Sequence, residues 1–133
     1  MAVKATVMSL IVAASFVVLS LPYDAAADCS DRTSLSATSD GEAVAASGLA
    51  YVRLVEADAR QTFAVQVKVD VPDGTQLSVL TNGQPVGMIT VALGIGTLDL
   101  SMPVMPGVDS VCSIGPVWVT DAGQTTTFLI GSF

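Results

Sequence analysis

Apolar and polar residues alternate with a period of two over much of the chain after residue 48. In the clearest stretch, apolar side chains occupy every second position: Phe63, Val65, Val67 and Val69. This alternation predicts a strand with one buried face and one exposed face. β-Branched residues dominate the repeat, which favours strands over helices.

Turn residues divide the rest of this region into pieces of strand length. Asn82-Gly83, between apolar segments 77–81 and 86–91, is the strongest hairpin signal. Other turns are predicted at Pro72-Asp73-Gly74, Gly94 to Gly96 and Asp121-Ala122-Gly123. Because Pro116 lacks a backbone donor, the strand after it is placed at 117–120, and the last strand at 125–133.

About seven strands and no amphipathic helix after residue 27 predict an all-β fold. We expect a small antiparallel β-sandwich, immunoglobulin-like or a related barrel, over residues 48–133. Residues 28–47 are rich in Ser, Thr, Asp, Ala and Gly. They are interpreted as an extended lead-in with one short edge strand around 33–38.

Residues 1–27 have the pattern of a secretory signal peptide. Lys4 precedes a long apolar run, and Pro22 separates that run from Ala25-Ala26-Ala27. A retained membrane anchor is the alternative, but the proline and the alanines are poor flanks for one. Lipidation of Cys29 is disfavoured because Asp28 precedes it. We therefore expect a secreted or periplasmic protein that meets the membrane only through this peptide.

The formal charge of the chain is −7, and it stays −7 after removal of residues 1–27. This sign disfavours nucleic acids and anionic lipid surfaces as partners. The two cysteines, Cys29 and Cys112, are too far apart in sequence for a C-x-x-C redox or metal motif. In an oxidising compartment they predict a disulfide, with intermolecular pairing as the lesser alternative.

The chain contains no histidine. This removes the usual general base at neutral pH and the histidine-dependent nucleophile pairs. The lysine that remains after residue 27 is Lys68, and it falls on the polar side of an alternating strand. No nucleophile elbow, phosphate-binding loop or dinucleotide motif occurs. We expect a protein that is not an enzyme and uses no cofactor.

Carboxylates are the remaining candidates for chemistry. Glu56 with Asp58, and Asp70 with Asp73, are pairs that could bind calcium or act in acid–base hydrolysis. Neither pair belongs to a recognisable metal-binding motif, so solvated turn charges are the favoured interpretation.

Trp118 is the single tryptophan. In its strand Val117 and Val119 face one way, and Trp118 and Thr120 the other. We expect the tryptophan to face the core. Exposed, it would be a possible ligand contact that stacks on a sugar or anchors a protein interface.

Three elements are shared with a group of uncharacterised bacterial exported β-domains. They are N-G-x-x-V-G at residues 82–87, G-x-G-x-L-x-L at 94–100 and the terminal G-x-F at 131–133. The chain resembles this group over residues 48–133, although the segment 102–114 with Cys112 departs from its pattern. The resemblance implies the β architecture and no activity.

The sequence therefore predicts an exported, non-catalytic β-sandwich with a binding, adhesion or envelope-structural role. Its partner would be a protein or a surface glycan, bound by a side-chain surface or by addition of a strand to an open edge. The alternatives are a small hydrolase that uses carboxylates alone and a small outer-membrane β-barrel.

Overall fold

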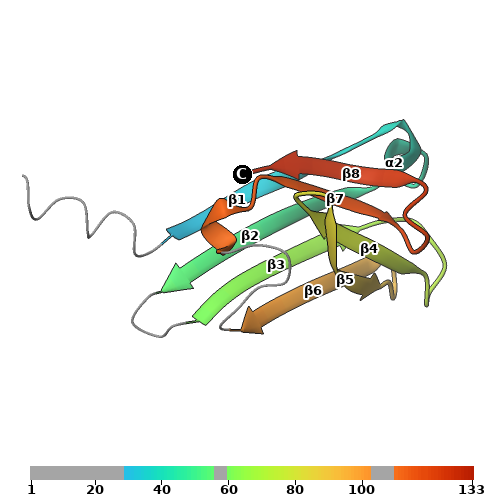
Figure 1. Cartoon of the computed structure of the whole chain (residues 1–133). Coiled ribbons are helices and arrows are strands. Elements are labelled where there is room, and N and C mark those ends of the chain that lie inside the picture. The colour runs from blue at the N-terminus through green and yellow to red at the C-terminus, as the bar shows by residue number, and fades with distance from the viewer. Residues whose placement is uncertain (1–28, 56–59, 103–109) are drawn as a thin grey trace, which may run out of the picture.

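The computed structural model describes residues 29–55, 60–102 and 110–133, which form an all-β domain (Figure 1). The predicted fold class is confirmed. The strands are β1 (Cys29–Ala37), β2 (Ser47–Val55), β3 (Arg60–Lys68), β4 (Gln76–Thr81), β5 (Gln84–Thr90), β6 (Ile95–Met102), β7 (Pro116–Asp121) and β8 (Thr127–Ser132). A short helix, α2 (Ser39–Ala43), follows β1, and a 3-10 turn, η2 (Val111–Ser113), precedes β7.

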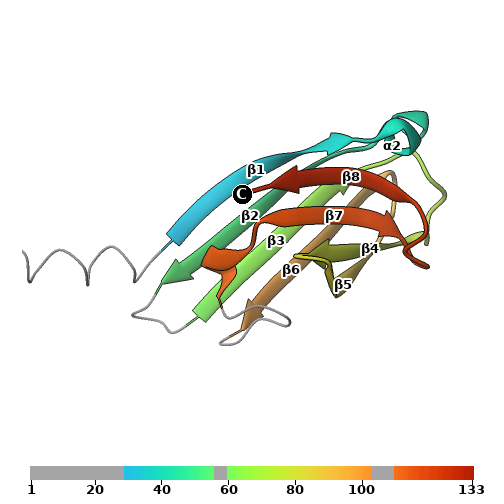
Figure 2. The ribbon, with the colours of Figure 1, turned by 45° about the horizontal axis from the view of Figure 1, so that its top comes forward.

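The strands form one antiparallel sheet in the order β5-β4-β7-β8-β1-β2-β3-β6. This sheet folds over itself, so that β2, β3 and β6 lie behind β4, β7 and β8 (Figures 1 and 2). The result is a small sandwich that is nearly closed into a barrel. The two end strands, β5 and β6, approach each other.

β1 joins the two layers. Its residues 29–35 pair with β2, whereas Ser36 and Ala37 pair with β8. The short edge strand expected around residues 33–38 is therefore a nine-residue strand inside the sheet. The lead-in sequence did not reveal this position because β8, the partner on the other side of β1, comes from the opposite end of the chain.

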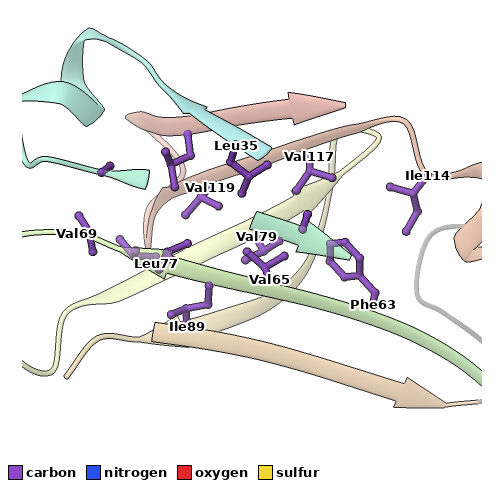
Figure 3. Close-up of a cluster of buried hydrophobic side chains, with 14 of the residues drawn as sticks. Leu35, Phe63, Val65, Val69, Leu77, Val79, Ile89, Ile114, Val117 and Val119 are labelled. Carbon is purple, nitrogen blue, oxygen red and sulfur yellow. The ribbon is translucent and has the colours of Figure 1, made fainter. Parts of the chain in front are cut away.

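The alternating residues of β3 point into the core as predicted. Phe63, Val65 and Val67 are almost fully buried, and Val69 just beyond the strand is buried with them. Figure 3 shows the facing side chains of the other layer, including Leu77, Val79, Val117 and Val119. The interior between the layers is thus a packed aliphatic core with a fully buried phenyl ring, that of Phe63, at the end near Ile114 (Figure 3).

Two hairpin turns have the left-handed backbone that two-residue connections require. Asn82 and Gly83, with φ of 51° and 82°, link β4 to β5 where the sequence predicted a hairpin. Leu93 and Gly94, with φ of 54° and 75°, lie between β5 and β6. In this second turn the backbones of Ala92 and Ile95 exchange two hydrogen bonds.

Glycines let β5 and β6, the two end strands of the sheet, approach each other closely. A Cβ at Gly96 would collide with Ile89, and one at Gly87 would lie 2.8 Å from the Leu98 side chain. Between these two strands, aliphatic side chains therefore pack directly against glycine backbone. Tight packing at this point follows directly from the absence of side chains.

η2 covers one end of the core. Val111 and Ile114 are buried, and the turn packs against β2 and β3. The Val111 amide donates to Oε1 of Gln61 at 2.8 Å, which gives the buried glutamine a polar partner inside the apolar interior. This hydrogen bond fastens η2 to the start of β3.

Candidate functional site

The Cys29–Cys112 disulfide predicted from the sequence is present, with Cα atoms 5.9 Å apart. It joins the start of β1 to η2, so it fastens both the first strand and the cover over the core. Neither cysteine is free. The bridge therefore has a structural position, at the start of β1 and in the turn before β7.

Ionisable side chains are divided unequally between the two layers of the sandwich. We call β1, β2, β3 and β6 the charged layer, because their strands contain these charged residues: Asp31, Arg32, Arg53, Arg60, Lys68 and Asp99. We call β4, β5, β7 and β8 the neutral layer. The strands of the neutral layer contain one ionisable residue, Asp121, at the end of β7.

The outer surface of the neutral layer has a row of apolar side chains across its strands. Pro85 is paired with Leu80, Leu80 with Trp118, and Trp118 with Ile130. Trp118 is 41% exposed and Ile130 is 44% exposed, while Leu80 is nearly buried between its neighbours. We call this outer surface, with the row at its centre, the neutral face.

The expectation that Trp118 faces the core is wrong. Val117 and Val119 are fully buried, so the alternation of β7 places the indole outside. The two flanking valines were the signal for this orientation, because β-branched pairs fill a core more readily than a Trp–Thr pair. The exposed alternative, in which Trp118 can contact a ligand, is the arrangement present.

Of the four candidate carboxylates, the structure describes Asp70 and Asp73, and these two have separate partners. Asp73 accepts a hydrogen bond from the Leu93 amide at 2.7 Å, so its carboxylate braces the β5–β6 turn. Asp70 is exposed after β3, and its backbone amide donates to the Val44 carbonyl. Glu56 and Asp58 lie outside the described residues.

Asp121 is a carboxylate that the sequence analysis did not single out. Its oxygens accept from the Thr126 amide, the Thr125 hydroxyl and the Thr125 amide, at 2.7–2.8 Å. These bonds, that of Thr126 first, hold the pKa of Asp121 below its ordinary value of 3.8. The carboxylate closes the β7–β8 turn, and the threonines four and five residues later were the sequence signal.

The hollows that the described residues form on the outer surface of the charged layer are shallow. One hollow, of about 270 Å³, lies over Ala64, between Tyr51 on one side and Asp99 on the other. Lys68 is exposed at the end of β3, as its strand position predicted. Within residues 29–55, 60–102 and 110–133, no three His, Cys, Asp or Glu side chains are grouped to hold a metal ion.

Comparison with known proteins does not assign a family. No protein-family model matches this chain, and no similar protein is found among the curated proteins. Among the described residues, no helix has the length and apolar character needed to cross a bilayer. The neutral face is thus the most distinctive candidate site on structural grounds.

Proposed function

We propose that this protein is an exported, non-catalytic binding module that uses the neutral face to hold its partner. The observation that supports this proposal is a half-exposed tryptophan in the middle of an apolar row, on a layer whose strands contain a single charged residue, Asp121. Exposed apolar patches on small proteins are frequently interaction sites, and tryptophan is common at their centres.

Free-energy considerations favour binding at this face. Covering apolar surface contributes about 25 cal/mol per Å². A partner that covers Trp118 and Ile130 gains this term without removing a charged group from water, because the strands beneath contain none apart from Asp121. The carboxylate of Asp121 is engaged within its own turn.

Export is supported by two features. Residues 1–27, which lie outside the described part, have the pattern of a signal peptide. The Cys29–Cys112 disulfide is of a kind that persists in oxidising compartments. Together they favour a secreted or periplasmic location and a partner that is a protein or a surface glycan.

Capture experiments with variants test the proposal. The disulfide-bonded protein, Trp118→Ala and the control Leu93→Ala would be compared on a glycan array and with surface-protein extracts. Leu93 is 87% exposed but lies on the β5–β6 turn, so the control removes an exposed apolar side chain elsewhere. We expect capture that falls at least tenfold in Trp118→Ala and is unchanged in Leu93→Ala.

Two results would contradict the proposal. Equal capture by the wild type and Trp118→Ala would show that the neutral face does not hold the partner. Hydrolytic turnover by the purified protein that is lost in Asp70→Ala or Glu56→Ala would favour the carboxylate hydrolase instead.

A further inference from the structure

We infer that the neutral face binds the neutral face of a second copy of this chain, so that the protein forms a symmetric dimer. This inference rests on the proposed function, because it names the partner of the same surface. Three features of the described residues favour a second copy as the occupant: the charge distribution, the order of side chains in the row, and the chemistry around Trp118.

Charge restricts how two copies can approach. Each chain has a formal charge of −7, so two copies repel each other at long range. The strands of the charged layer contain six charged side chains, whereas those of the neutral layer contain Asp121 alone. Contact between two neutral faces therefore buries apolar surface and leaves the charges of both copies in water.

The row has an order that suits a two-fold axis. Trp118 pairs with Leu80 on one side and with Ile130 on the other, so an aliphatic residue lies on each side of the indole. A two-fold axis beside Trp118 would place each indole over an aliphatic neighbour of the other copy. In such an isologous contact both copies use the same self-complementary surface, so the assembly ends at two copies.

The surroundings of Trp118 favour protein over sugar. A sugar needs hydrogen-bonding groups around its stacking platform, since its hydroxyls must keep partners when they leave water. The cross-strand neighbours of the indole are Leu80 and Ile130, and both are apolar. The Thr120 hydroxyl, on the same side of β7, is in a buried residue and already donates to the Asp121 carbonyl. No charged side chain projects from the strand positions of the row.

The size of the face places the expected interface among small, weak ones. Four strands of six or seven residues, about 4.8 Å apart with about 3.4 Å per residue, cover roughly 400 Å². A standard interface buries about 800 Å² on each partner. We therefore expect a reversible dimer that dissociates at micromolar or lower concentration.

Sedimentation and tryptophan fluorescence test the dimer directly. Trp118 is the single tryptophan, so its emission reports on the proposed interface. The disulfide-bonded protein, Ile130→Asp and the control Leu93→Asp would be studied over a wide concentration range. Ile130→Asp adds a charge to the neutral face and keeps the indole, while Leu93→Asp adds the same charge at an exposed turn.

We expect the average mass of the wild type and of Leu93→Asp to rise from one copy towards two with concentration. The Trp118 emission should shift to the blue in parallel, and Ile130→Asp should weaken association at least tenfold while unfolding at the same temperature. Added salt should strengthen the dimer, because it screens the repulsion between the two acidic copies.

Two results would overturn the inference. One is a protein that stays monomeric at millimolar concentration in high salt, and the other is a dimer that Ile130→Asp leaves intact. If the protein is monomeric but Trp118→Ala still abolishes capture of another ligand, the second copy is ruled out while the binding function stands. If no capture depends on Trp118 either, both proposals fail.

Discussion

Leu93 occupies a backbone conformation that leucine rarely adopts. Its φ of 54° places it in the left-handed region, where a side chain crowds the backbone and asparagine or glycine is preferred. It is also 87% exposed, so burial does not compensate for this strain. The turn is held by Gly94 and by the hydrogen bond from the Leu93 amide to Asp73.

Leu93→Asn should therefore stabilise the protein. Asparagine tolerates the left-handed region, so we expect the free energy of unfolding to rise by about 1 kcal/mol. Urea denaturation measures this as a higher midpoint with an unchanged slope. A lower midpoint would show that the exposed leucine makes a stabilising contact.

Asp121 should make stability depend on pH in acid. Its folded pKa is lowered by the hydrogen bonds from Thr126 and Thr125, so the ionised form is favoured by folding. This contribution to the free energy of unfolding is fully present above pH 3.8, the ordinary pKa of the carboxyl. It is lost as the pH falls through the lower pKa of the folded protein. Asp121→Asn should be less stable than the wild type at neutral pH, and the difference should shrink in acid.

Thermal unfolding of both proteins between about pH 7 and pH 2 measures this difference. A gap in melting temperature that stays constant over the whole range would show that the charge of Asp121 has no part in holding the turn.

At the scale of elements, sequence patterns predicted local structure well and long-range pairing poorly. The alternation of β3 and the Asn82-Gly83 hairpin are encoded by neighbouring residues, and both are present. The helix α2 was not predicted because the contacts that stabilise it come from residues far away in the sequence. Its cap, Thr38, binds the Thr127 carbonyl, and Gly41 lies against the backbone of Phe128.

The contact between η2 and β3 depends on Gln61. Gln61→Leu keeps a side chain of similar size but leaves the buried Val111 amide without its acceptor. The loss should be about 1–3 kcal/mol in the free energy of unfolding, measured by urea denaturation.

Thr81→Val is the matched control for this change. The Thr81 hydroxyl is buried and has no hydrogen-bond partner within the described part of the chain, so its removal should be neutral or stabilising. Equal effects of the two substitutions would show that the Gln61–Val111 hydrogen bond contributes nothing specific.

At the scale of the whole molecule, the disulfide closes a loop across most of the domain. Its cysteines are 83 residues apart in sequence, for which the chain-entropy estimate is about 4–5 kcal/mol. Replacing both cysteines with serine should lower the free energy of unfolding by that amount, and reductant should then have no further effect. A loss below about 1 kcal/mol would show that the bridge constrains the unfolded chain little.

The neutral face could be predicted only in part. The sequence shows that segments 76–90 and 116–120 have no charged residues. It does not show that these segments share one layer, because that depends on pairing β7 between β4 and β8. Likewise, the orientation of Trp118 follows from which side of β7 meets the core, and this is settled by packing against the opposite layer.

The proposed binding face requires Trp118 to lie outside the core. Acrylamide quenching of the native protein at submicromolar concentration, where the proposed dimer dissociates, measures this directly. We predict red-shifted emission and a quenching constant that is a large fraction of the value in urea. Blue-shifted emission that acrylamide cannot quench at this dilution would place the indole in the interior and contradict the account.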